Sequence, residues 1–260
     1  IRGIVAGIEK FLFINDRTIN KKKLMMFLPE AKKTSQRAIT TDEVRLLLSA
    51  SANPRQRALI HILSATGCRP TALADLKMKD IEIMAHDFTS VLFYSGSKNE
   101  FQHFCHPEAT NAINDYLKNR KQTGEELEPE SYLFCKRNCI GDEKGRMSGA
   151  GIGSVLEHLM KYADISRVKQ NGKRYDLPVC NGLRNRFNTI LKRDSNIPYA
   201  VAESFMDHKL RMESSYFKPT RLELLNEYKK AVAELVISKE SLLKLENDNK
   251  QKHIEELKSG

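Results

Sequence analysis

The sequence contains no long apolar run. No stretch approaches the roughly 18 consecutive apolar residues of a membrane-spanning helix, so we expect a soluble protein with no membrane partner. The apolar stretch from Ile4 to Ile14 contains Glu9 and Lys10 and has no cleavage pattern, so it does not resemble a secretory signal. No internal repeat is visible either.

Cysteine is scarce. The chain has five cysteines, which is an odd number, and their spacing is irregular. This does not indicate a disulfide framework, so we expect a reducing, cytoplasmic environment. Cys135 and Cys139 have the spacing of half a zinc site, but no second ligand pair follows at a usual distance. We therefore predict that the thiols are structural. The five are Cys68, Cys105, Cys135, Cys139 and Cys180.

Acidic residues are outnumbered by basic ones. With 43 Lys and Arg against 33 Asp and Glu, the formal net charge is +10 over 260 residues. This excess of positive charge suits a polyanionic partner and does not by itself identify one. The length suits one main domain with appendages. Because the chain begins at Ile1 rather than Met, we expect a fragment of a longer protein.

Helical patterns dominate the chain. Residues 1 to about 30 carry apolar side chains at helical spacing, and the basic stretch from Ala31 to Arg37 indicates a linker. Thr40 or Thr41 caps the next helix, with Glu43 in capping-box range. Further helices are predicted at 54–65, 70–76, 108–120, 150–163, 181–194 and 198–206.

Two residues mark boundaries of the predicted helices. Gly67 suits the end of the helix over 54–65, because glycine tolerates the positive φ of a helix terminus. Pro70 suits the first turn of the helix that follows.

Between Ile81 and His106 the spacing of apolar residues changes from a helical pattern to one typical of strands. Short segments at 81–83, 90–94 and 101–105 are rich in β-branched and aromatic residues, which predicts three antiparallel strands. The connection from Ser95 to Glu100 is a hairpin turn with Lys98 at its tip. The predicted fold is mainly α with a small three-stranded antiparallel sheet, an α+β arrangement.

The C-terminal stretch is one long helical candidate from Arg221 to Lys258. An approximate heptad seam, which fades after Leu245, indicates packing on its own domain, on a neighbour, or a partly free helix. The seam consists of Leu225, Tyr228, Val232, Leu235 and Leu242.

Five residues in ordered contexts suit one chemistry. The first lies at a helix-to-helix turn, the second at a hairpin tip, the third at the opening of a helix, and the last two follow in quick succession. They are Arg69, Lys98, Arg184, His208 and Tyr216.

This set of side chains is sufficient for metal-free attack on a DNA phosphodiester. A tyrosine phenol supplies a nucleophile that conserves the bond as a phosphotyrosine. Two arginines grip the non-bridging oxygens in bidentate fashion, in place of divalent metals. A lysine on a hairpin can protonate the leaving 5′ oxygen, and a histidine can bond the phosphate or move protons.

The ordered set resembles the tyrosine recombinase (phage integrase-like) family over residues 38–220. The stretches Phe27–Glu30 and Ser64–Arg69, with the long tail, are most similar to archaeal integrases. The resemblance implies the tyrosine-recombinase catalytic fold and a site-specific recombinase or integrase without metal or nucleotide cofactor. It also implies a 3′-phosphotyrosyl intermediate, double-stranded DNA as partner, a tetrameric synapse and a nucleoid-associated location.

The resemblance also implies a domain organisation. Residues 1–35 resemble the C-terminal remnant of a helical, SAM-like core-binding domain with its basic linker, and 36–220 the catalytic domain. Residues 221–260 form the C-terminal helix, a possible oligomerisation tail through coiled-coil contacts or helix exchange.

Carried over by position, Arg69 and Arg184 are the phosphate clamp, Lys98 the general acid and Tyr216 the nucleophile. His208 matches the family's later histidine. Asn181 departs from the usual histidine, and asparagine bonds a phosphate but is no base near neutral pH.

A second departure is Asp207, which replaces the usual glycine before His208. Its carboxylate either orients His208 or turns outward.

Rival residues and alternative functions remain open at this stage. Lys77 and Lys79 compete for phosphate contact, Arg186 competes with Arg184, and Tyr228 is the nearest tyrosine to Tyr216 but is expected to pack. Alternative functions are type IB topoisomerase-like relaxation, a DNA-binding module with a decayed site, and an assembly protein built on the tail.

Overall fold

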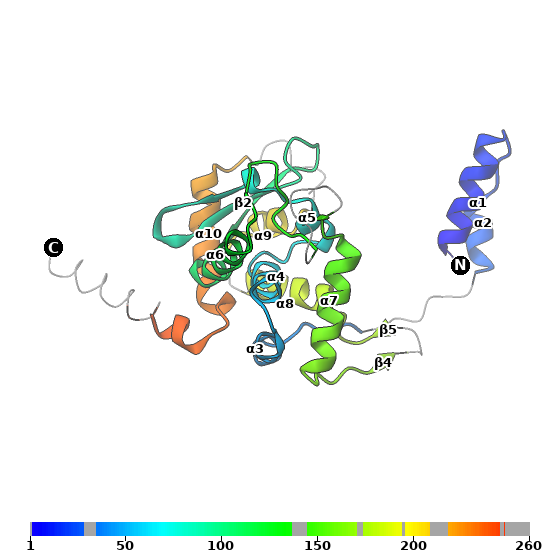
Figure 1. The fold of residues 1–260 in the computed structure, drawn as a ribbon. Coiled ribbons are helices and arrows are strands. Elements are labelled where there is room, and N and C mark those ends of the chain that lie inside the picture. Colours follow the sequence, from blue (N-terminus) through cyan, green and yellow to red (C-terminus); the bar gives the residue numbers. More distant parts are fainter. Residues whose placement is uncertain are drawn as a thin grey trace.

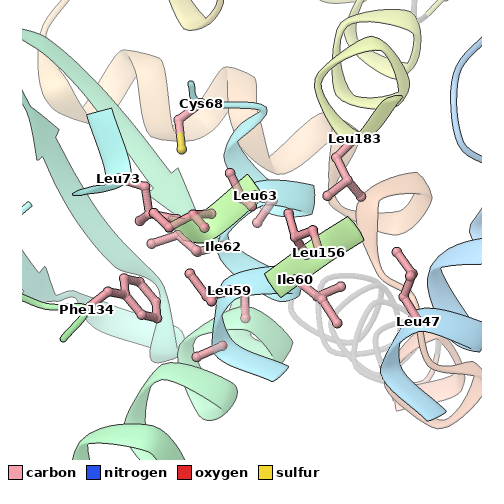
Figure 2. Packing of buried hydrophobic residues seen from close by; sticks show 14 of the residues in the cluster. Leu47, Leu59, Ile60, Ile62, Leu63, Cys68, Leu73, Phe134, Leu156 and Leu183 are labelled. Atoms are coloured by element: carbon pink, nitrogen blue, oxygen red, sulfur yellow. The ribbon is translucent and has the colours of Figure 1, made fainter. Parts of the chain in front are cut away.

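Helix α4 (Pro54–Thr66) is the central element of the fold in the computed structural model, which describes residues 2–28, 35–136, 145–170, 174–193, 196–208, 218–244 and 247. All of its residues from Ala58 to Thr66 are buried. Figure 2 shows its leucines and isoleucines meeting Leu73, Leu156 and Leu183 from three other helices. This single core explains why a helix with little amphipathic character is stable here.

Both ends of α4 follow from local sequence. The Asn53 side chain accepts a hydrogen bond from the backbone N–H of Gln56, and Pro54 occupies the first turn. Gly67 ends the helix at φ +58°, as predicted. A Cβ at Gly67 would lie 2.6 Å from the Phe187 ring, so the position requires glycine for space as well as conformation.

Seven further helices surround α4 or extend its layers (Figure 1). α3 begins with the predicted capping box between Thr40 and Glu43. The predicted helices are confirmed with small shifts at their ends. They are α3 (Thr41–Ala50), α5 (Pro70–Asp75), α6 (Pro107–Gln122), α7 (Gly149–Tyr162), α8 (Val179–Arg193) and α9 (Tyr199–Phe205). Helix α10 (Arg221–Leu235) is much shorter than predicted.

The predicted three-stranded antiparallel sheet is confirmed, in the order β1 (Ile81–Ile83), β2 (Thr89–Phe93), β3 (Phe101–Cys105). Val91 lies opposite His103 in the register, and β2 is displaced by one residue from its predicted position. Short 3₁₀ turns at Met78–Asp80 and Ala85–Asp87 flank β1. The fold is therefore mainly helical with a small sheet, as expected.

A second, two-stranded antiparallel sheet was not predicted. β4 (Lys169–Gln170) pairs with β5 (Arg174–Tyr175) between α7 and α8. Each strand has only two residues, which is too short for an alternating pattern to mark it in the sequence.

The prediction of one long C-terminal helix is wrong. α10 ends at Leu235, residues 236–238 are not helical, and a helical segment resumes at 239–244. The break has a physical cause, because Glu108 accepts hydrogen bonds from the N–H groups of Ile237 and Ser238. Arg45 donates to the Ile237 carbonyl oxygen at 2.7 Å. Ser238 then caps the next turn by accepting from the N–H of Ser241.

The predicted heptad seam packs on its own domain. Leu225, Tyr228, Val232 and Leu235 are buried in a second apolar cluster that also contains Phe187 and Phe205. Of the arrangements left open by the sequence, α10 adopts the one in which the seam completes this chain's core.

The N-terminal helices lie apart from this core. α1 (Arg2–Ile14) and α2 (Lys21–Met26) lie beside each other in Figure 1, and Lys21 pairs with Glu9 at 2.7 Å. Ile4, Ile8 and Phe11, the expected apolar face of α1, are exposed. In the described part of the chain, no helix is both long and apolar enough to cross a membrane.

Candidate active site

Arg184 joins two turns that are far apart in the sequence. From α8 its Nη1 donates to the carbonyl oxygen of Gly67 at 2.7 Å, and its Nη2 donates to the carbonyl oxygen of Met206. The first acceptor lies in the α4–α5 turn and the second at the end of α9. One guanidinium therefore fixes the two backbone segments that carry Arg69 and His208.

Arg69 makes a second connection between the same two turns. It is the N-cap residue of α5 in an extended conformation, and its side chain makes no capping bond. Its Nη1 lies 2.5 Å from Oδ2 of Asp207. The Arg69 side chain is 45% exposed and the Asp207 side chain 15%, so the pair lies at the surface with its cationic end accessible.

Asp207 has a left-handed backbone, with φ +53°. Glycine suits this position because it adopts a positive φ freely. Aspartate can replace it because aspartate tolerates the left-handed conformation better than most residues. Both expectations for its side chain are wrong. The carboxylate neither bonds His208 nor turns outward, because it pairs with Arg69.

The two arginines form a concentrated positive site. Burial lowers the pKa of Arg184, and the nearby charge of Arg69 lowers it further, whereas Asp207 and Tyr94 act in the opposite direction. Two guanidinium groups that repel each other are stabilised by an anion placed between them. The site is therefore built to hold negative charge.

His208 is oriented by a carboxylate that the sequence did not reveal. Its Nδ1 lies 2.8 Å from Oε2 of Glu203, whose side chain is 8% exposed and also contacts the ammonium of Lys192. Burial opposes the ionisation of Glu203, but hydrogen bonds from Lys192 and His208 outweigh it and lower its pKa. An ionised Glu203 fixes the imidazole with Nε2 on the opposite side.

A sequence signal for Glu203 does exist. It is a glutamate within the apolar α9 sequence of Val201, Ala202 and Phe205, all of which are buried. A buried charged residue needs a partner of opposite charge or a hydrogen-bond donor. The identity of that partner depends on how α8 and the end of α9 pack, which the sequence does not state.

Asn181 lies one turn before Arg184 on α8, with an exposed side chain. The spacing of three residues places both side chains on one face of the helix. The position therefore faces the same region as Arg184, as the predicted pattern required.

Lys98 lies in the exposed turn between β2 and β3, as predicted. At the base of this hairpin the hydroxyl of Tyr94 lies 3.4 Å from that of Thr71, two residues after Arg69. The hairpin is thus anchored to the helix that Arg69 begins. Tyr216, the predicted nucleophile, lies outside the described residues.

The rival cations have other partners. Arg186 is buried and donates to the carbonyl oxygens of Glu234 and Leu235. Lys77 and Lys79 both pair with Glu130, at 2.8 and 2.5 Å.

Among the tyrosines, Tyr228 is fully buried and donates to the carbonyl oxygen of Ala65. Its expected packing role is confirmed. Cys68, Cys105 and Cys135 are buried, Cys180 is partly buried, and Cys139 lies outside the described residues.

Comparison with known proteins identifies the family of the chain. The model of the phage integrase family matches residues 37–220, a span that holds both arginines, Asp207 and His208. The chain belongs to the phage integrase family. No curated protein sequence matches the chain.

Solved structures of recombinases share the fold. XerA recombinase aligns with a TM-score of 0.52 and 17% identity over 87% of this chain and 73% of its own. The integrase from mycobacterium phage Brujita aligns with a TM-score of 0.56 and 14% identity, over 88% of this chain and 69% of its own. A lambda integrase dimer bound to a COC′ core site aligns with a TM-score of 0.52 and 14% identity, over 82% of this chain and 70% of its own.

These similarities establish the tyrosine-recombinase catalytic fold expected from the sequence. The narrower resemblance to archaeal integrases is not supported by them.

Proposed function

We propose that the chain is a site-specific DNA recombinase or integrase that cleaves and rejoins DNA strands through Tyr216. The observation that carries the proposal is the convergence of Arg69, Arg184 and His208 on two adjoining turns. Family membership supports the reaction class. Double-stranded DNA is the substrate, in keeping with the lambda integrase dimer on its core site.

In the proposed reaction, the phenol of Tyr216 loses its proton to solvent and its oxygen attacks the scissile phosphorus. The bond between phosphorus and the 5′ oxygen breaks, leaving a 3′-phosphotyrosyl enzyme and a free 5′ hydroxyl. Attack of a 5′ hydroxyl on the phosphotyrosine reverses the step, so no nucleotide is consumed. Because the bond is conserved, strand exchange needs neither hydrolysis nor resynthesis.

The arginines stabilise the charge that develops on the phosphoryl oxygens. Arg184 is held in place by two backbone carbonyl groups, so its side chain needs little reorganisation when it binds phosphate. Arg69 uses one nitrogen for Asp207, and its exposed remainder faces solvent where a phosphate would enter. In this scheme the two cations take the place of a divalent metal.

Proton transfer and orientation fall to the remaining residues. Lys98 donates a proton to the leaving 5′ oxygen from the β2–β3 turn. His208, with its Nδ1 towards Glu203, presents Nε2 to a non-bridging oxygen. Asn181 donates an amide hydrogen bond where the family usually has histidine.

Assembly follows from the same proposal. Four protomers form a synapse on two duplexes, and residues 1–35 belong to a core-binding domain that encircles DNA with 36–220. Since α10 is buried in its own core and Leu242 packs against the same cluster, exchange of a C-terminal segment between protomers begins beyond residue 242. We expect the protein to be associated with the nucleoid.

Two departures from the family pattern favour an alternative function. The Asp207 carboxylate beside Arg69 and the asparagine at 181 are both departures expected of a decayed DNA-binding module. Such a module would bind DNA with steep salt dependence and form no adduct. Relaxation of supercoils without synapsis would instead indicate a type IB topoisomerase-like activity.

The deciding experiment uses supercoiled plasmid in EDTA. The wild type is expected to form covalent protein–DNA adducts and to relax the plasmid, and Tyr216→Phe to do neither. Tyr162→Phe, at an exposed tyrosine on α7, is the matched control and should behave as wild type. If adducts persist in Tyr216→Phe, another nucleophile acts and the assignment is wrong.

A further inference from the structure

Asp207 occupies the position of an anion on Arg69. Its Oδ2 lies 2.5 Å from Arg69 Nη1, and in the described part of the chain no other acceptor is bonded to that guanidinium. A phosphate oxygen would make the same kind of contact with the same donor. The carboxylate therefore stands where substrate charge is expected.

The backbone holds Asp207 in this place. Its N–H donates to the carbonyl oxygen of Ser204, and the next N–H, of His208, donates to the carbonyl oxygen of Glu203. Met206, the residue before it, is bonded to Arg184. With φ fixed at +53° between these contacts, the carboxylate cannot leave Arg69 by backbone motion without breaking the bond to Arg184.

Charge makes the contact more than a structural bond. Arg69 and Arg184 contribute two positive charges, and Asp207 cancels one of them at the point where phosphate enters. An anionic side chain beside an anionic substrate disfavours binding of that substrate. If Asp207 served only to orient Arg69, an uncharged residue of the same shape would weaken the site; if it competes, that residue would strengthen it.

We propose that Asp207 is a competitor built into the phosphate site: it weakens the capture of a DNA phosphate by Arg69 until the remaining protein–DNA contacts displace it. The inference rests on the proposed function. It means that isolated phosphates are held poorly and that a fully engaged DNA site is needed to free Arg69. Discrimination between cognate and random DNA is thereby increased.

Two substitutions test this. Asp207→Asn keeps shape and left-handed tolerance and removes the charge, and Asp207→Gly removes the side chain at a φ that glycine accepts. The matched controls are Asp164→Asn and Asp164→Gly. Asp164 has φ +49° after α7 and is exposed, so it gives the same change in net charge without a contact to Arg69.

Equilibrium binding to random-sequence duplex is measured first, with Tyr216→Phe as background so that no adduct forms. Asp207→Asn is expected to tighten binding roughly 3- to 10-fold over Asp164→Asn, the scale of removing one nearby like charge at a partly solvated site. Equal binding by the two variants overturns the proposal. Weaker binding overturns it as well, and assigns Asp207 to positioning.

Adduct formation on a nicked duplex, with Tyr216 restored, gives the second readout. Faster adduct formation by Asp207→Asn than by wild type at limiting DNA supports competition, and slower formation contradicts it. Absence of adducts in every variant would contradict the proposed function, and the binding comparison would still decide the role of Asp207.

Discussion

Arg184 on α8 donates a hydrogen bond to the carbonyl oxygen of Gly67, a residue 117 positions earlier in the chain. The same guanidinium bonds the carbonyl oxygen of Met206. The residue proposed to hold the substrate phosphate thus also holds together the turns that shape its own site. Loss of this side chain should therefore affect chemistry and folding together.

Replacing Arg184 by lysine tests both roles. A lysine ammonium cannot span two diverging carbonyls, so at least one buried acceptor loses its donor, at about 1–3 kcal/mol in the free energy of unfolding. We expect adduct formation to fall by roughly 100-fold or more, since a transition-state contact is lost. Urea unfolding and adduct assays measure the two effects. Arg193→Lys, at an exposed position of the same helix, should change neither.

Gly67→Ala tests the turn between α4 and α5. The new Cβ would meet the Phe187 ring at 2.6 Å in a left-handed conformation, so we expect a loss of about 1–3 kcal/mol in the free energy of unfolding. Gly153→Ala, in α7 with no atom near the added Cβ, should stabilise by about 0.5–1 kcal/mol. Equal effects at the two glycines in thermal unfolding would contradict this account of Gly67.

The buried histidines predict loss of stability in acid. Burial, with smaller contributions from His61 and Arg186, lowers the pKa of His106 from 6.5 to about 3, and burial lowers that of His103 to a similar value. Below pH 6.5 the unfolded chain binds protons that the folded chain does not, so stability falls as the pH drops towards 3. Each histidine contributes about 1.4 kcal/mol per pH unit in that window.

Urea unfolding between pH 7.5 and 4 measures this slope, and His106→Leu isolates one contribution. Both ring nitrogens of His106 lack a hydrogen-bond partner in the described part of the chain, so leucine removes no bond. The free energy of unfolding of His106→Leu should fall with decreasing pH by about 1.4 kcal/mol per pH unit less than that of the wild type. An unchanged slope would show that the pKa of His106 is the same in the folded and unfolded chains and would contradict this account.

Glu108→Gln tests the break after α10. The carboxylate accepts from the N–H groups of Ile237 and Ser238 at 2.8 and 2.9 Å, and an amide offers only one acceptor atom in its place. We expect faster hydrogen exchange at these two amides and a loss of about 1–3 kcal/mol in the free energy of unfolding. Asp115→Asn, at an exposed position of the same helix, is the control.

The parts of this fold that could be predicted are those with local causes. Pro54 and Gly67 delimit α4, Thr40 and Glu43 begin α3, and alternating β-branched segments mark the sheet. The order of the site residues was likewise visible, because each lies in its own short motif. Local signals therefore sufficed for most helices and for the three-stranded sheet, and they provided the candidate residues of the proposed site.

The missed features depend on contacts between distant segments. The break at 236–238 is caused by Glu108 and Arg45, more than a hundred residues earlier, whereas the local sequence there favours a continuous helix. The pairing of Asp207 with Arg69 spans 138 positions. No periodicity within a segment contains such information, so the alternatives for Asp207 stayed unresolved until the turns were placed together.

Three successive residues at the end of α9 each serve a different partner: Met206 bonds Arg184, Asp207 bonds Arg69, and His208 bonds Glu203. A nascent or locally unfolded chain in which this short stretch has not docked has no assembled phosphate site, whatever the state of its nucleophile. Under the proposed function, competence to cut DNA would be tied to completed folding, so a partly folded chain would make no strand breaks.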